Sequence, residues 1–301
     1  MTTVLLHNDR AVRWVHPVAW WSWAICGAAA ASLTSNPLAL LGISVGALSV
    51  VLTRGAHAPW AASMSTLLKI AVAIVVFRII FQTLLGAPIG LHVVAALPEI
   101  ALPGWLTGLR LGGVITIESL LLGLVEGMRF AAILLCIAAA TTVAAPSRLF
   151  RALPDALAEL GTVLVIAMTF APHLVQDFMR IRRAQRLRGR RIRGVRSVVQ
   201  ALAPVVDGAM ERSLQLAAAM NSRGYGRTRA TRHRPDPWLA PETTVLAAGA
   251  MTALITVIRL GPETQLSLAP LAWPTMSPVY ALALAAFALP AFLTPLTPRT
   301  V

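Results

Sequence analysis

The sequence predicts an all-α integral membrane protein with about six transmembrane helices and a cytoplasmic domain of two long amphipathic helices. Of the 301 residues, 57% are hydrophobic and only 13% are charged, whereas soluble domains contain about 25% charged residues. Charge is also concentrated: window 180–234 holds 15 arginines against Asp207 and Glu211, and so supplies +13 of the formal net charge of +14. This composition excludes an ordinary soluble enzyme, a disordered chain and a disulfide scaffold.

Four apolar stretches define an N-terminal transmembrane region, residues 1–145. They are 15–33, 38–53, 67–85 and 114–143, each close to or above the length that crosses a bilayer. Because further spans follow, we expect the first to be a retained helix and not a cleaved signal peptide. Four tryptophans near its start are typical of interfacial aromatic residues: Trp14, Trp20, Trp21 and Trp23. Segment 86–113, punctuated by proline and glycine, is expected to lie outside.

Two further apolar stretches, 243–260 and 278–293, define a C-terminal transmembrane region, residues 241–301. With six crossings, five arginines that flank the spans fall on one side, which the positive-inside rule assigns to the cytoplasm. These residues are Arg10, Arg13, Arg148, Arg151 and Arg299. We therefore expect a multi-pass protein of the cell membrane with both termini in the cytoplasm.

Residues 146–240 form the expected cytoplasmic domain, because a +13 segment belongs inside. Two helices are predicted there, Asp155–Arg188 and Pro204–Arg223. Each begins near a proline and ends just before a glycine, which is the usual arrangement of helix-terminating residues. The apolar run 157–169 is only 13 residues long, too short to cross alone, and is assigned to the first helix.

Both predicted helices end in the same pattern, A-x-x-x-R-G. The first pattern consists of Ala184, Arg188 and Gly189, and the second, 35 residues later, of Ala219, Arg223 and Gly224. Residues four apart share a helix face, so a small alanine permits close approach while the arginine reaches a carboxylate with its planar fork. The alternative is two ordinary basic helix ends with glycine caps. The duplication favours a two-fold or pseudo-two-fold partner.

Here the sequence resembles the T component of energy-coupling factor (ECF) transporters, the EcfT/CbiQ family. The most specific stretches are Ala184-Gln185-Arg186-Leu187-Arg188-Gly189 and Ala219-Met220-Asn221-Ser222-Arg223-Gly224. His16-Pro17, Asn36-Pro37 and 112–118 also lie where family-like features are expected. Leu187 and Ser222 stand where the strict triplet of the family has alanine. This departure affects the fine specificity for the partner more than the docking role itself.

The resemblance implies a transmembrane scaffold of an importer, not an enzyme, with no cofactor of its own. The implied partners are two cytoplasmic ABC ATPase subunits, a membrane S component that binds a vitamin or metal ion, and the lipid bilayer. The implied ATPase-docking residues are Ala184, Arg188, Gly189, Ala219, Arg223 and Gly224. The sequence itself also indicates that the ATPase is a separate subunit. The single lysine, Lys69, follows no glycine-rich loop, so the chain has no P-loop motif for binding ATP.

Charged side chains also occur inside the predicted spans: Arg78 in the third and Glu118, Glu126 and Arg129 in the fourth. Such groups are costly in hydrocarbon and are usually paired, so we expect Glu126 to pair with Arg129, or Arg78 with either glutamate. Gly123 and Gly127 form a G-x-x-x-G pattern that allows another helix to approach closely. That helix would be internal or part of the S component.

Two alternatives use the same charges: a membrane-embedded enzyme acting through Glu118, Glu126 and a histidine, and a self-contained secondary transporter. The second should show an inverted repeat, and none is found. The six histidines show no metal-ligand spacing, so no metal site is predicted. Nucleic acid is not an expected partner, because Tyr225 is the only aromatic residue of the basic window and stacking platforms are therefore absent.

Overall fold

The computed structural model describes residues 15–54, 64–85, 90–100, 111–144, 149–150, 152, 157–189, 195–227, 238–259, 266–268 and 271–293. The chain divides into two compact units: Met1–Pro146 together with Pro237–Val301, here called the transmembrane unit, and Ser147–Asp236, here called the helix-pair unit. The arginines expected to orient the chain, at positions 10, 13, 148, 151 and 299, lie outside the described residues.

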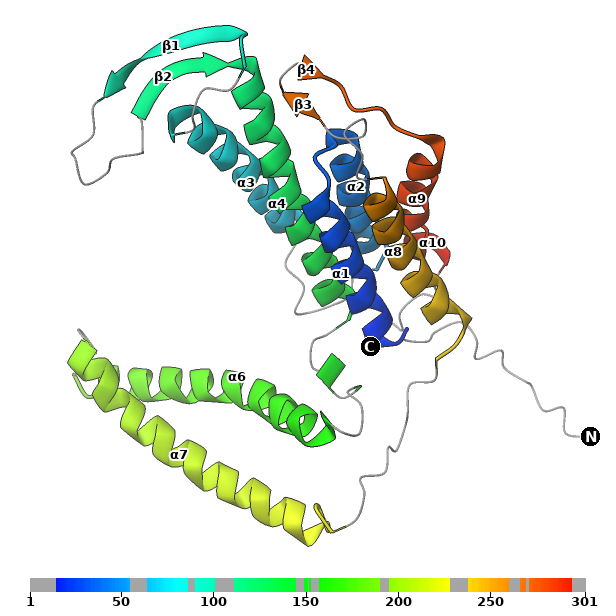
Figure 1. Ribbon diagram of the computed structural model, residues 1–301. Coiled ribbons are helices and arrows are strands. Elements are labelled where there is room, and N and C mark those ends of the chain that lie inside the picture. The colour runs from blue at the N-terminus through cyan, green and yellow to red at the C-terminus, as the bar shows by residue number, and fades with distance from the viewer. Residues whose placement is uncertain are drawn as a thin grey trace, which may run out of the picture. The chain divides into compact units, whose positions relative to one another are not determined.

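The transmembrane unit is a bundle of helices with two small strand pairs in its connections (Figure 1). Its described helices are α1 (Pro17–Leu33), α2 (Pro37–Arg54), α3 (Met64–Leu85), α4 (Ile117–Val143), α8 (Ala240–Ile258), α9 (Pro278–Ala288) and α10 (Pro290–Leu293). Strand β1 (Val93–Ile100) pairs antiparallel with β2 (Leu111–Thr116), and β3 (Ser267–Leu268) with β4 (Leu271–Ala272). The predicted all-α class is confirmed.

Proline and a side-chain cap begin three of these helices. The Nδ1 atom of His16 accepts a hydrogen bond from Val18 N–H at 3.3 Å, and Asn36 Oδ1 accepts one from Leu38 N–H at 3.0 Å. Ser277 Oγ similarly accepts from Tyr280 N–H at 3.3 Å. Each cap satisfies a backbone donor that the first helical turn leaves without a partner, and the proline that follows has no such donor.

The fourth helix begins later than predicted. Residues 114–116 belong to strand β2, and α4 starts at Ile117. The reason is local: Thr116 and Ser119 form a reciprocal capping box, with Thr116 Oγ1 accepting from Ser119 N–H at 3.2 Å. Gly112 and Gly113 have φ of 91° and 107°. These positive values are not helical and are easily adopted by glycine, so both residues belong to the strand and not to the helix.

The core of the transmembrane unit lies among α1, α2, α4, α8 and α9. Trp23 is fully buried, stacks on Phe287 with ring centroids 4.4 Å apart, and donates its indole N–H to the Phe287 carbonyl at 3.2 Å. Trp20 is also buried. Both side chains therefore face the interior of the bundle, where the indole donor of Trp23 finds its acceptor. Their position at the membrane interface stays a prediction.

Length and composition make four described helices capable of crossing a membrane. These are Thr66–Leu85, Ile117–Val143, Glu159–Leu187 and Ala240–Ile258; shorter apolar helices run over Pro37–Thr53 and Pro278–Phe292. One of the four, in the helix-pair unit, was predicted to lie outside the bilayer. It differs from the others in its C-terminal third, where Arg180, Arg182, Arg183 and Arg186 follow the apolar part.

The helix-pair unit consists of α6 (Ala158–Leu187) and α7 (Val195–Ser222) packed on each other. The predicted start of the first helix at Asp155 lies outside the described residues. The predicted start of the second near Pro204 was wrong, because α7 begins at Val195 and contains Pro204 in its interior. Ala201 and Val205, one turn apart beside that proline, are buried, and this packing offsets the backbone hydrogen bond that the proline removes.

Candidate docking surface and intramembrane charges

The first motif forms the C-terminal end of α6. The Arg188 N–H donates to the Ala184 carbonyl at 3.2 Å, which is the last α-helical hydrogen bond, and the Gly189 N–H donates to the Arg186 carbonyl at 3.0 Å. Gly189 has φ of 76°, a conformation that a residue with a Cβ adopts at a cost. Arg188 is thus the cap residue, and Gly189 turns the chain out of the helix.

The second motif forms the end of α7 in the same way. The Arg223 N–H donates to the Ala219 carbonyl at 3.3 Å, the Gly224 N–H donates to the Asn221 carbonyl at 2.9 Å, and Gly224 has φ of 77°. A further bond from Tyr225 N–H to the Met220 carbonyl, at 3.0 Å, completes a Schellman motif. The repeated sequence therefore corresponds to a repeated backbone conformation.

Both helix ends are open surfaces within the described part of the chain. The motif residues Ala184, Arg188, Ala219 and Arg223 are exposed. A Cβ added to Gly189 or Gly224 would meet no atom within 4 Å. No ion pair joins Arg188 or Arg223 to another described residue. Their guanidinium groups are free to bind an external carboxylate.

An ion pair joins the two helices at equivalent positions. Arg212 Nη2 of α7 lies 2.9 Å from Asp177 Oδ2 of α6, and Arg180 lies 3.7 Å from the other oxygen. Asp177 and Arg212 are 35 residues apart, the same separation as Arg188 and Arg223. Each lies eleven residues before the motif arginine of its own helix. Sequence reasoning missed this pair, because the shared 35-residue spacing marks the two residues as equivalent but does not indicate that they meet.

The Asp177–Arg212 ion pair lies between the two motifs along the helix pair. Helices α6 and α7 run antiparallel (Figure 1). Arg188 therefore lies eleven residues from the ion pair toward one end of the helix pair, and Arg223 lies eleven residues from it toward the other end. At 1.5 Å per residue the two arginines are about 30 Å apart along the pair. Figure 1 shows the C-terminal ends of α6 and α7 at opposite ends of the helix pair. One small ligand cannot contact both motifs.

Glu126 and Arg129 form an ion pair inside α4, one of the pairings expected. Arg129 Nη1 lies 2.5 Å from Glu126 Oε1, and both side chains are about 20% exposed. Arg129 Nη2 also donates to the Thr34 carbonyl at 3.2 Å and to Ser35 Oγ at 2.9 Å. Arg129 therefore ties the turn between α1 and α2 to α4.

Glu118 contacts His92 and not Arg78. The buried Glu118 Oε1 lies 2.6 Å from His92 Nδ1 and accepts from the Leu91 N–H at 3.4 Å. Gly90, with φ of 90°, approaches so closely that an added Cβ would lie 2.2 Å from the Glu118 carboxyl carbon. This carboxylate fixes the entry to β1 onto the start of α4. Glu118 and Glu126 are eight residues, about 12 Å, apart along the helix, and each has its own partner, so they form no catalytic pair.

The G-x-x-x-G pattern packs on an internal helix. A Cβ on Gly123 would lie 3.1 Å from Ile79 Cα, and one on Gly127 would lie 2.8 Å from Val75 Cα, both in α3. Absence of a side chain at these positions allows the two helices to touch backbone to backbone. Arg78 lies beside this contact, with its guanidinium carbon 6.0 Å from the ring centre of Phe81. No described carboxylate pairs with Arg78.

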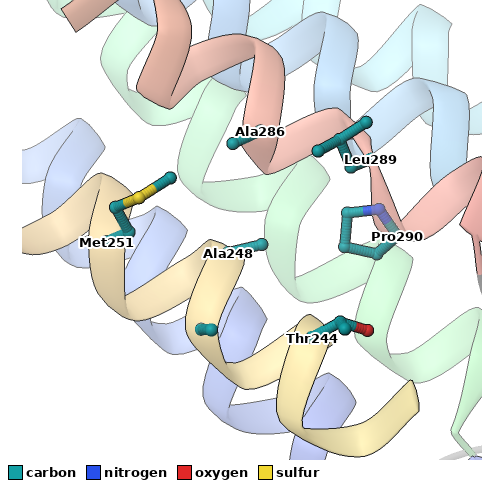
Figure 2. Close-up of a pocket in the computed structure, with 7 residues that line it drawn as sticks. Thr244, Ala248, Met251, Ala286, Leu289 and Pro290 are labelled. Atoms are coloured by element: carbon teal, nitrogen blue, oxygen red, sulfur yellow. The ribbon is translucent and has the colours of Figure 1, made fainter. Parts of the chain in front are cut away.

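A cavity of about 240 Å³ lies between α8 and the α9–α10 break (Figure 2). It is lined by Thr244, Ala247, Ala248, Met251, Ala286, Leu289 and Pro290. Thr244 Oγ1 donates to the Pro241 carbonyl at 2.8 Å, and none of the lining residues is titratable. The cavity offers an apolar surface and no group for acid, base or nucleophilic chemistry.

Comparison with known proteins identifies relatives of one kind. The family CbiQ, described as cobalt transport protein, matches residues 10–234, more than half of the chain. The energy-coupling factor transporter transmembrane protein EcfT of Leuconostoc gelidum is 30% identical over 127 residues, 37% of this chain and 47% of that protein. The protein of the same name from Streptococcus thermophilus is 34% identical over 104 residues, 32% and 39% of the two chains. The matched part thus spans less than half of either relative.

Proposed function

The chain belongs to the CbiQ family of cobalt transport proteins, and from this premise we propose that it is the transmembrane T component of an energy-coupling factor importer. In this role the transmembrane unit anchors the chain in the cell membrane and gathers a separate substrate-binding S component. The helix pair faces the cytoplasm and docks two ABC ATPase subunits. The substrate is a vitamin or a metal ion carried by the S component.

One observation carries this proposal: two exposed helix ends of the same conformation, about 30 Å apart, each with a free arginine. A single binding event needs only one such end. Two copies placed around an ion pair of equivalent residues, Asp177 and Arg212, suit a partner with two similar binding sites. Two ATPase subunits related by a two-fold axis are such a partner.

The chemistry of each end supports an acidic groove as its counterpart. An arginine fork makes bidentate hydrogen bonds to a carboxylate, and Ala184 or Ala219, one turn earlier, leaves room for a close surface. The cationic side chain also offsets the partial negative charge of the helix C-terminus before docking. The arginine is therefore held at a defined place while its charge remains available.

ATP hydrolysis belongs to the partner subunits in this proposal. The only lysine of the chain, Lys69, lies in α3, in a helix interior and not after the glycine-rich loop that cradles phosphates. The helix pair would transmit ATPase movement to the transmembrane unit.

The direct test is to purify the tagged chain from membranes of its own host and identify the proteins that accompany it. We expect two copies of ATPase subunit, of one or two kinds, and one membrane subunit. Arg188→Glu combined with Arg223→Glu should remove the ATPases and abolish uptake, whereas each single substitution should leave one contact and a weakened complex.

Two neighbouring arginines provide matched controls. Arg186→Glu and Arg227→Glu change the charge equally, two and four residues from the motif arginines, and should lower the retention of the ATPases less than the motif substitutions do. Retention of the ATPases by the double motif variant at the wild-type level would overturn the proposal, as would their equal loss from the control variants.

A further inference from the structure

Helix α3 carries a polar strip without hydrogen-bond partners among the described residues. Arg78 and Gln82 lie four residues apart, hence on one face. The Arg78 Nε–H donor is buried and has no hydrogen-bond partner among the described residues, and the Gln82 side chain, 9% exposed, makes no hydrogen bond to a described residue. Polar groups within a bilayer are expected to be satisfied by protein.

The nearby carboxylates of α4 do not satisfy this strip. Glu126 is paired with Arg129. Glu118 contacts His92 and the Leu91 N–H through Oε1, and its buried Oε2 makes no hydrogen bond to Arg78 or Gln82. On the α4 side, the strip meets Gly123 and Gly127, which contribute no side chain. The described part of the transmembrane unit therefore provides no acceptor for Arg78.

Helix α3 is also peripheral. Its principal packing partner is α4, with a smaller contact to β2, and only 17% of its spanning segment is buried, against 39% for α4. The exposed residues beside the polar strip are large and apolar: Val76, Phe77, Ile80, Phe81 and Leu84. An apolar helix face with an unsatisfied cation at its edge is complementary to a membrane helix that carries a hydrogen-bond acceptor.

We propose that this face of α3, with Arg78 and Gln82 at its edge and Phe77 and Phe81 beside them, is the docking surface for a transmembrane helix of a partner subunit that presents a carboxylate or amide oxygen at that depth. The inference rests on the proposed function, since the S component is the membrane partner which that function supplies.

A lipid phosphate fits the geometry less well than a protein acceptor. Arg78 lies 12 residues, about 18 Å, from Thr66 and seven residues, about 10 Å, from Leu85 within the span. Its guanidinium carbon lies 6.0 Å from the centre of the Phe81 ring, and its Nε atom is buried. This depth within the span favours an acceptor on a neighbouring helix, because lipid phosphates lie outside the hydrocarbon.

The test is photo-crosslinking in the intact complex, with a photoreactive amino acid at Phe77, which is 66% exposed. The matched control is Leu254 of α8, which is 61% exposed and lies in another helix. We expect Phe77 to crosslink to the substrate-binding membrane subunit and Leu254 not to do so. Crosslinks from Phe77 to lipid alone, or to a second copy of this chain, would overturn the proposal.

Substitutions then separate docking from folding and from the proposed function. Arg78→Leu should reduce the co-purified membrane subunit about tenfold, while the ATPases remain bound, which shows that the variant is folded. Arg78→Lys should retain an intermediate amount, because the charge is kept and the fork is lost. Unchanged recovery of the membrane subunit with Arg78→Leu contradicts the inference alone, whereas absence of ATPases from the wild-type complex contradicts the proposed function.

Discussion

Asp177 and Arg212 bind each other across the helix pair from equivalent positions in its two halves. Each lies three turns before the arginine of its own motif, and their side chains meet at 2.9 Å. A contact between equivalent residues fixes the register of two antiparallel helices, as a register-specifying polar contact does in other helix pairs. The separation of the two proposed docking sites is therefore set by this ion pair.

Asp177→Ala should loosen the helix pair by about 1 kcal/mol, a value discounted because Arg212 is 40% exposed. The remaining Arg212 has a buried Nη1 without a partner. Hydrogen exchange of amides in α6 and α7 measures the change. The reversed pair, Asp177→Arg with Arg212→Asp, should recover much of the protection. Equal exchange in wild type and Asp177→Ala would show that the ion pair does not hold the helices in register.

Gly189→Ala and Gly224→Ala should fray the last turn of α6 and of α7. The cost, about 1 kcal/mol for each, arises from the left-handed φ alone, because a Cβ has open space at both positions. Gly208→Ala in the interior of α7 also has open space but no positive φ, and should instead stabilise the helix by roughly 0.5–1 kcal/mol. Amide exchange near Arg188 and Arg223, compared with that near Gly208, distinguishes the two effects. Faster exchange in all three variants would contradict this account.

The two docking sites should differ in their response to salt. The ten residues ending at Gly189 contain five arginines, whereas the ten ending at Gly224 contain one, and neither set contains an acid. Exposed charges attract an acidic partner less when salt screens them. ATPase retention by Arg223→Glu, which leaves the α6 site, should therefore fall more steeply with added salt than retention by Arg188→Glu. Parallel salt curves would indicate that the surrounding arginines make no contact with the partner.

Arg129→Met should destabilise the transmembrane unit by about 3 kcal/mol, since it leaves a partly buried Glu126 without its cation. It also removes the donor to the Thr34 carbonyl and Ser35 Oγ. Glu126→Gln should cost less, because an amide oxygen still accepts from Arg129. Thermal unfolding in detergent measures both. A larger loss from Glu126→Gln than from Arg129→Met would contradict the role of Arg129 in holding the turn.

Local relationships along the chain could be predicted, and distant ones could not. The pairing of Glu126 with Arg129 needs only helical geometry, since the residues are three apart. The end of α6 at Gly189 likewise follows from a glycine directly after the basic last turn of the helix. The contact of His92 with Glu118 joins residues 26 positions apart in the sequence, with both strands of the β1–β2 pair between them, and no periodicity indicates it.

Sequence reasoning failed where packing opposed a local rule. Pro204 was interpreted as a helix start because proline favours the first turn, yet the packing of Ala201 and Val205 keeps it inside α7. The tryptophan cluster indicated an interfacial position, but it did not indicate that Trp23 finds both an aromatic partner and a carbonyl acceptor in Phe287.

The sequence by itself determined the membrane class, the apolar spans and the two repeated helix ends, because bilayer thickness, helical period and glycine conformation act over a few adjacent residues. The tertiary structure alone decided that Gly123 and Gly127 receive α3, that Asp177 meets Arg212, and that no residue in the described part of the chain accepts a hydrogen bond from Arg78. These depend on which surfaces of separate helices meet, and only the packed chain fixes that choice.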